Sequence, residues 1–236
     1  MTRFVLTPIA VLLTACAATN PLHSPTPTVT PAQSLAIAAS YQNHLWLPRP
    51  ENAFHGTSPD GIRVDTPDNS HRPDNHTQHG WWKPHQPATG IPYQWGGFDT
   101  PQQFDTKIAA GHYAGDLYTP AKRRGLDAAV SRFATGIDCS GFVSRCWRLP
   151  ASYSTRQLPE LCIPLDSFDE LEPGDIINKS NAHTVLFVRF VGTHRKYLEV
   201  YETGRATSWR VARHIIPRSA IELPGYRPLR YRHMAQ

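Results

Sequence analysis

Residues 138–146 read DCSGFVSRC and decide the fold, because they place a cysteine where a helix begins. Asp138 is a residue type that caps helices, and Pro150 ends the run. The apolar residues between them recur at helical spacing: Phe142, Val143, Cys146 and Trp147. Cys139 would then lie in the first turn, where the helix dipole favours a thiolate, the form that attacks carbonyl carbons. The alternative is an inert cysteine that packs the helix against a core.

The segments around this helix predict the fold class. Residues 34–48 are typical of a short helix, and residues 106–134 are helical in parts. A turn at 171–175 is followed by apolar or alternating segments that predict five strands, at 176–177, 184–191, 197–203, 209–216 and 226–232. Helices followed by a series of strands indicate an α+β domain, in which helices pack on an antiparallel sheet of about five strands.

A thiol nucleophile requires a base, and the base requires an orienting group. His183 opens the apolar strand 184–191, and an imidazole at the end of a strand can face a helix that packs on the sheet. The next strand carries Glu199 and Glu202 on opposite faces, so only one of these carboxylates can point at His183. The residues alone leave that choice open. They also leave open the alternative that His183 is only a polar residue at the end of a loop.

The N-terminal segment predicts export. Residues 1–15 combine Arg3 with an apolar stretch that is too short to anchor stably in a bilayer. The segment Leu13-Thr14-Ala15-Cys16 resembles the lipobox of bacterial lipoproteins. This resemblance implies cleavage before Cys16 and lipidation of Cys16. Because no Asp follows, it also implies attachment to the outer membrane, facing the periplasm. An ordinary secretory signal is the alternative.

Export would place the remaining cysteines in an oxidising compartment. A disulfide between Cys146 and Cys162 would close a loop of about 15 residues and stabilise the fold by about 3 kcal/mol. Two separate buried thiols are an equal alternative, because the geometry of the two side chains decides the outcome.

Composition and patterning divide the rest of the chain. Residues 16–33 are rich in Pro, Thr and Ala and predict a tether, residues 34–90 an N-terminal extension, and residues 91–236 the catalytic domain. The formal net charge is +5, and no run of Lys or Arg indicates nucleic-acid binding. A mildly basic surface of this kind is compatible with an anionic envelope polymer, and equally with a simple role in solubility.

Within the extension, polar and aromatic residues offer two further candidate sites. Residues of the types that bind metal ions cluster at His71, Asp74, His76, His79 and His85. Their spacing matches no zinc pattern, so we expect a polar loop and no metal or cofactor. Trp81 and Trp82 could stack on a sugar or a peptide, but we expect them to pack in the core under the loop.

Four segments occur in the order seen in NlpC/P60 cysteine peptidases: Tyr93-Gln94-Trp95-Gly96-Gly97, DCSGFV at 138–143, LEPGD at 171–175 and the His183 strand. The chain resembles this family from residue 91 to about 204. The resemblance implies a papain-like core. It also implies hydrolysis of peptidoglycan stem peptides, often between D-glutamate and the diamino acid.

The resemblance also implies roles for single residues. By position, Cys139 corresponds to the nucleophile, His183 to the base and Glu202 to the third member of a triad. Tyr93 corresponds to an active-site tyrosine, which would stabilise the oxyanion together with the Cys139 backbone amide. The third residue departs from the family, where it is more often His.

Other positions bear on the substrate. Asp138 and Ser140 correspond to residues that contact the free amine of the substrate in some members of the family. About forty residues separate Gly97 from Asp138, which is more than in many members, and this insertion is placed to line or cover the cleft.

Three hypotheses follow. The first is a lipid-anchored cysteine peptidase that hydrolyses stem peptides through a Cys-His-Glu triad and a thioester. The second is an amidase or acyltransferase on the same scaffold, because a thioester can pass its acyl group to water or to an amine. The third is a non-catalytic envelope-binding protein with a relic cleft, since a fold alone does not decide activity.

Overall fold

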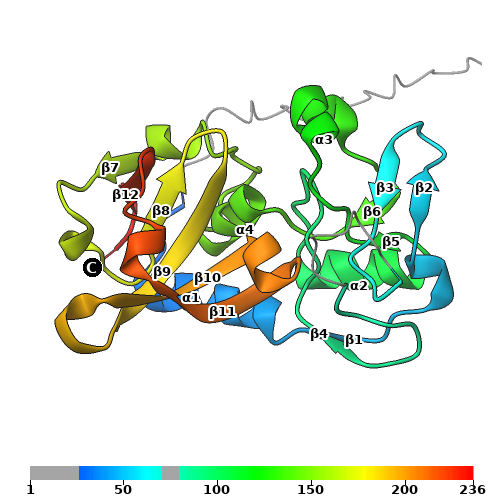
Figure 1. Cartoon of the computed structure of the whole chain (residues 1–236), viewed down its shortest axis with the longest axis horizontal. Coiled ribbons are helices and arrows are strands. Elements are labelled where there is room, and N and C mark those ends of the chain that lie inside the picture. Colours follow the sequence, from blue (N-terminus) through cyan, green and yellow to red (C-terminus); the bar gives the residue numbers. More distant parts are fainter. Residues whose placement is uncertain (1–26, 71–79, 236) are drawn as a thin grey trace, which may run out of the picture.

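The computed structural model describes residues 27–70 and 80–235 (Figure 1). The α-helices are α1 (Pro31–Gln42), α2 (Pro101–Ala109), α3 (Pro120–Gly125) and α4 (Cys139–Cys146). The strands are β1 (Leu45–Trp46), β2 (His55–Thr57), β3 (Arg63–Asp65), β4 (Ala88–Thr89), β5 (Tyr113–Ala114), β6 (Ala134–Thr135), β7 (Cys162–Pro164), β8 (Ile176–Lys179), β9 (His183–Val191), β10 (Tyr197–Gly204), β11 (Arg210–Pro217) and β12 (Tyr226–Tyr231). The predicted signal segment 1–15, Cys16 and most of the histidine cluster lie outside the described residues.

The largest sheet in the described part of the chain has six strands, in the order β11-β10-β9-β8-β12-β7, and occupies the left half of Figure 1. Every neighbouring pair is antiparallel, so the predicted α+β class with an antiparallel sheet is confirmed. Strands β8 to β12 correspond to the five predicted strands. Sequence analysis missed β7 because its three residues, which end in Pro164, are too few to show a strand period.

The two faces of the sheet bury different clusters of side chains, because successive residues of a strand point to opposite faces. On one face, α4 packs against β9 and β10, as Figure 1 shows, and contributes to the main core. The other face buries a second cluster of Leu171, Ile177, Val185, Phe187, Leu198, Val200 and Ile221. Alternation places Glu202 on this second face, in phase with Val200. His183 is in phase with Val185 but is the first residue of β9, and at this strand end it lines cavities on both sides, one with Cys139 and one with Glu202.

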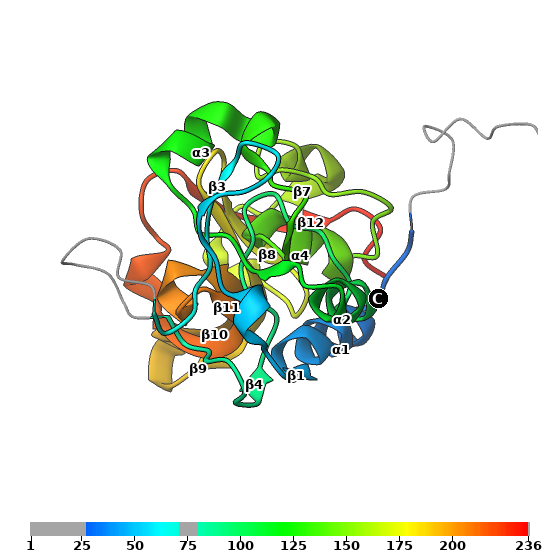
Figure 2. The same cartoon turned by 90° about the vertical axis from the view of Figure 1, so that its right-hand side faces the viewer.

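Helix α1 begins at Pro31, inside the range predicted as a tether. The Thr30 hydroxyl accepts a hydrogen bond from the Gln33 amide at 3.2 Å, and the Gln33 side chain accepts one from the Thr30 amide at 3.0 Å. Val29 is fully buried and pairs with Met234, so this segment lies beside the C-terminal end of the chain (Figure 2). The tether prediction is therefore wrong for residues 27–33.

The N-terminal extension shares the main core with the rest of the domain. Trp46 packs edge-on against Trp82, with ring centroids 5.5 Å apart, and against Phe104 at 5.0 Å. Trp82 is 1 % exposed, which confirms its predicted place in the core. Trp81 is partly buried beside it. The described parts of 34–90 are thus packed against the sheet domain and not separate from it.

The insertion between Gly97 and Asp138 carries α2 and α3, and a buried ion pair fixes α3. The Lys122 Nζ lies 2.6 Å from the Asp116 Oδ2 and 2.6 Å from the Arg63 carbonyl oxygen. Burial raises the pKa of Asp116 to about 7, against the effect of the Lys122 charge. Both views place α3 at the upper edge of the molecule and α1 at the lower edge (Figures 1 and 2).

Trp147 joins α4 to the sheet, and we expect its loss to be severe. The indole is fully buried, stacks on Tyr231 with ring centroids 4.7 Å apart, and donates a hydrogen bond to the Gly174 carbonyl at 3.1 Å. Trp147→Ala should lower the free energy of unfolding by about 3–5 kcal/mol in urea denaturation. The control Leu223→Ala, at a side chain that is 50 % exposed, should change it by less than about 0.5 kcal/mol.

Candidate active site

Cys139 is the first residue of α4, as predicted, and two glycine-containing segments hold it there. The Asp138 carboxylate caps the helix, accepting from the Gly141 amide at 2.6 Å and from the Ser140 hydroxyl at 3.0 Å. The first turn packs so closely on the segment before it that a Cβ on Gly141 would lie 2.3 Å from the Gly97 carbonyl oxygen. The cysteine is therefore fixed in position by backbone contacts and not only by its own side chain.

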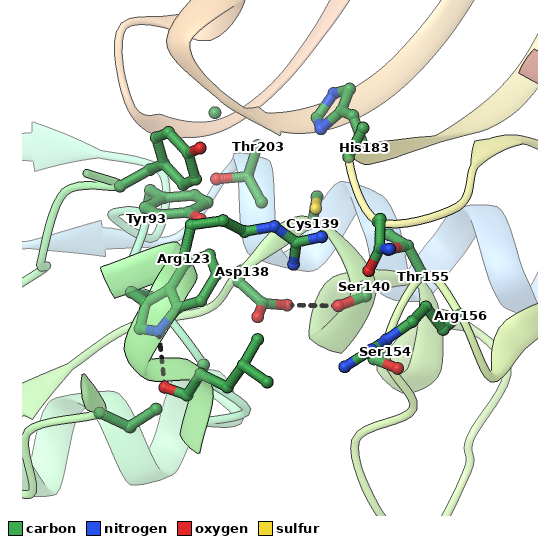
Figure 3. Close-up of a pocket in the computed structure, with 18 of the residues that line it drawn as sticks. Tyr93, Arg123, Asp138, Cys139, Ser140, Ser154, Thr155, Arg156, His183 and Thr203 are labelled. Carbon is green, nitrogen blue, oxygen red and sulfur yellow. Dashed lines mark hydrogen bonds between the residues drawn. The ribbon is translucent and has the colours of Figure 1, made fainter. Parts of the chain in front are cut away.

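His183 begins β9 and faces the same cavity as Cys139 (Figure 3). Its Nε2 lies 2.5 Å from the Glu202 Oε2, which leaves Nδ1 as the nitrogen for the thiol. Burial works against protonation of this ring, but the side chains of Cys139 and Glu202 outweigh burial and raise the pKa of His183 to about 10. The two neighbouring side chains thus favour the protonated form of this imidazole.

Glu202 supplies the carboxylate, and Glu199 does not. Glu202 lies on β10 and is 4 % exposed, whereas Glu199 pairs with Arg189 at 2.5 Å and Arg213 at 2.9 Å. Burial alone would raise the pKa of Glu202, but two histidine partners lower it to about 2. The choice that the residues left open is decided by the alternation of side chains along β10.

His214 is the second of these histidine partners, and sequence analysis missed it. Its Nε2 lies 2.5 Å from the Glu202 Oε1, so each carboxylate oxygen has one imidazole partner. His214 lies on β11 directly opposite Val200 of β10. Val200 is two residues before Glu202, so the side chains of His214 and Glu202 lie on the same face of the sheet. The pairing register of β10 and β11 was needed to find it, since nothing in the local sequence around His214 distinguishes it.

The cavity beside Cys139 has a volume of about 510 Å³ and is lined by Tyr93, Asp138 and Ser140, all predicted (Figure 3). Tyr93 is 4 % exposed, and its amide donates to the Trp209 carbonyl at 2.8 Å. Burial, with the nearby Cys139 and Asp138 charges, raises the pKa of Tyr93 well above its usual value. Its phenol therefore stays a hydrogen-bond donor.

Thr203 also lines the cavity and was not predicted. Its hydroxyl is buried and has no hydrogen-bond partner among residues 27–70 and 80–235. Figure 3 shows it between Tyr93 and His183 in that view. Alternation along β10 accounts for this position, since Thr203 faces the α4 side when Glu202 faces the other.

The other described cysteines do not form the disulfide that the sequence left open. Cys146 and Cys162 are both free and both buried, with exposures of 0 % and 1 %. Burial raises the pKa of Cys146 well above its usual value and that of Cys162 to about 12. These two thiols are therefore packing residues, unlike Cys139.

The described part of the chain lacks a metal-binding cluster and a membrane-spanning helix. Within it, no three His, Cys, Asp or Glu side chains gather in an arrangement suited to a metal ion. Nor does any described helix have the length and apolar character needed to cross a membrane. Comparison with family models, with curated proteins and with solved structures finds no match to this chain.

The arrangement can perform nucleophilic acyl transfer. An ionised sulfur at a helix N-terminus can attack a carbonyl carbon. The protonated His183 can then deliver its proton to the leaving group. Tyr93 lines the same cavity, and its phenol is a hydrogen-bond donor that can stabilise an oxyanion.

Proposed function

We propose that this protein is a cysteine peptidase that hydrolyses peptide bonds in peptidoglycan stem peptides. The observation that carries the proposal is that His183, whose ring lies 2.5 Å from the Glu202 carboxylate, lines the same cavity as Cys139 at the N-terminus of α4, and that both side chains raise its pKa. Structural ion pairs also perturb histidines, but here the perturbed ring faces a cavity that holds a cysteine.

The proposed reaction has two steps. The Cys139 thiolate adds to the scissile carbonyl, the C–N bond breaks, and the leaving amine takes a proton from His183, which gives a thioester and a free amine. A water molecule then adds to the thioester, with His183 accepting one of its protons. The C–S bond breaks, and the products are a carboxylic acid and the regenerated thiolate–imidazolium pair.

The substrate class and the papain-like assignment rest on the resemblance to NlpC/P60 peptidases. Helix α4 carrying the cysteine, followed by the antiparallel sheet carrying His183 and Glu202, is the order that the resemblance implies. Attachment through lipid on Cys16 to the outer membrane, facing the periplasm, is part of the same proposal and rests on the sequence alone.

Digestion of purified muropeptides tests the proposal. The wild-type protein should cut the stem peptide into two products. Mass spectrometry should show that their summed mass exceeds the mass of the substrate by one water. An amidase would instead separate the sugar from the first amino acid. An acyltransferase would give a conjugate when an amine acceptor is added. A relic cleft would give none of these products.

A further inference from the structure

The insertion that carries α2 and α3 places two exposed apolar side chains on the wall of the cavity that holds Cys139. Tyr118 lies just before α3 and is 42 % exposed, and Leu126 follows α3 and is 39 % exposed. Among the large hydrophobic side chains that are exposed in the described part of the chain, only these two line the cavity. Exposed apolar side chains that gather at a cavity mark a binding surface, whereas single ones scattered over a protein need no explanation.

Trp95 connects these two side chains. Its ring centroid lies 5.7 Å from that of Tyr118, and its indole N–H donates a hydrogen bond to the Leu126 carbonyl oxygen at 3.1 Å. Trp95 also lines the cavity. The three residues Trp95, Tyr118 and Leu126 therefore form one surface on the cavity wall, which we call the apolar platform.

The backbone of Leu126 adopts a conformation that favours glycine, with φ 50° and ψ −128°. Residues other than glycine are strained in this region, and such strain is found at sites that clamp a ligand. Packing in the core does not account for a leucine at this position, because Leu126 belongs to neither buried cluster. Its position on the cavity wall gives the side chain a role.

Two polar side chains accompany the apolar platform. The Asp127 carboxylate and the Arg123 guanidinium both line the cavity, and neither has a hydrogen-bond or ion-pair partner within the described part of the chain. They supply free acceptors and free donors beside an apolar face. This combination suits a ligand that is apolar on one face and carries hydroxyl or amide groups around its edge.

The apolar platform lies on the Tyr93 side of the cavity. Burial is the main cause of the raised pKa of Tyr93, and Tyr118 is near enough to contribute to it. Figure 3 shows Tyr93 on one side of Cys139 and Thr155 and Arg156 on the other. A substrate that crosses Cys139 thus meets an apolar wall on one side and a polar wall on the other.

We propose that the apolar platform binds a pyranose ring of the substrate, so that the protein acts on stem peptides that are still attached to a sugar. A pyranose presents a face of C–H groups that packs on aromatic and aliphatic side chains. Its hydroxyl and acetamido groups lie around the edge, where Asp127 can accept hydrogen bonds and Arg123 can donate them. Stem-peptide side chains offer no such face, since they are methyl groups or chains that end in a charge. This inference rests on the proposed peptidase function and names the part of the substrate that the insertion recognises.

Two substrates test the inference: a stem peptide linked to a disaccharide, and the same stem peptide without sugar. The wild-type protein should cleave the sugar-linked substrate with a kcat/KM about 10-fold or more higher. Tyr118→Ala should remove most of that preference, because it deletes the exposed ring, and Tyr118→Phe should keep it. The matched control Tyr197→Ala removes a tyrosine that is 46 % exposed and lies outside the cavity, and should leave the preference unchanged.

Leu126→Gly is a second test, in which the fold is not at risk. Glycine adopts a φ of 50° without strain, so the free energy of unfolding in urea should not fall. The preference for the sugar-linked substrate should nevertheless decrease, because the apolar platform loses a side chain. A full preference in Leu126→Gly would contradict the proposal.

Binding to an inactive variant separates this inference from the peptidase proposal. In calorimetric titration, Cys139→Ala should bind the sugar-linked peptide about 10-fold more tightly than the free peptide, and Cys139→Ala/Tyr118→Ala should bind both alike. If Cys139→Ala shows the preference but the wild-type protein cleaves neither substrate, the sugar site stands and the peptidase function is wrong. Equal binding of the two substrates to Cys139→Ala, or a preference that survives Tyr118→Ala, overturns the inference.

Discussion

Replacing Cys139 with alanine is expected to lower kcat/KM for a stem peptide by at least about 10⁴-fold while leaving the fold intact. The sulfur forms the covalent intermediate, and within the described cavity no other thiol can take its place. His183→Gln should have an effect of similar size, because the Cys139 thiol then loses its proton acceptor and the thiolate loses its counter-ion. Turnover of a muropeptide, with circular dichroism to verify the fold, measures both effects.

The chain offers a matched control for this prediction. Cys162→Ala removes a thiol that is also buried, with 1 % exposure against 9 % for Cys139, but that lies in β7 and does not line the cavity; this variant should keep near wild-type turnover. Iodoacetamide near neutral pH should label Cys139 much faster than Cys146 or Cys162, since burial raises the pKa of both packing thiols. Residual activity above about a tenth in Cys139→Ala would point to a different nucleophile.

Local sequence patterns predicted most of the elements that carry the site. Asp138 and the apolar spacing after Cys139 correctly predicted the start of α4, because capping and periodicity are local effects, whereas the helix ends at Cys146, before the predicted stop at Pro150. The strands of His183 and Glu202 were predicted for the same reason. Shorter elements such as β7 depend on pairing with a distant strand, here β12, and have no local pattern to detect.

The parts of the site that sequence analysis missed depend on contacts between distant segments. His214 reaches Glu202 only because β10 and β11 pair in one particular register. Arg123 reaches the cavity because Lys122, next to it, is anchored to Asp116 and to the Arg63 carbonyl oxygen. The disulfide between Cys146 and Cys162 could not be decided for a similar reason, since the direction of two side chains is a tertiary property.

Loss of the Glu202 carboxylate is the second change expected to have a large effect. Glu202→Gln should reduce kcat/KM by about 10²–10⁴-fold, because His183 loses the partner that orients its ring and stabilises its charge. The carboxylate raises the pKa of His183, so its removal lowers that pKa from about 10. Protonated His183 is the form that donates a proton to the leaving group, so the alkaline limb of the pH–rate profile should move to lower pH.

His214 acts through Glu202 as a positioning residue, and its replacement should reproduce part of this effect. His214→Ala leaves the Glu202 Oε1 without its partner in a site where the side chain is 5 % exposed, so the carboxylate is both less fixed and less readily ionised. We expect a loss of about 10-fold or more in kcat with the same direction of shift in the alkaline limb, and partial rescue by His214→Gln, which keeps a donor.

Glu199→Gln is the matched control on the same strand. It breaks ion pairs with Arg189 and Arg213, whose side chains are 63 % and 37 % exposed, so the free energy of unfolding should fall by no more than about 1 kcal/mol. The pH–rate profile should not move, because Glu199 points away from His183. A shift of the alkaline limb in Glu199→Gln but not in Glu202→Gln would mean that the carboxylate facing the base is on the other side of β10. The assignment of both Glu202 and His214 would then fail together.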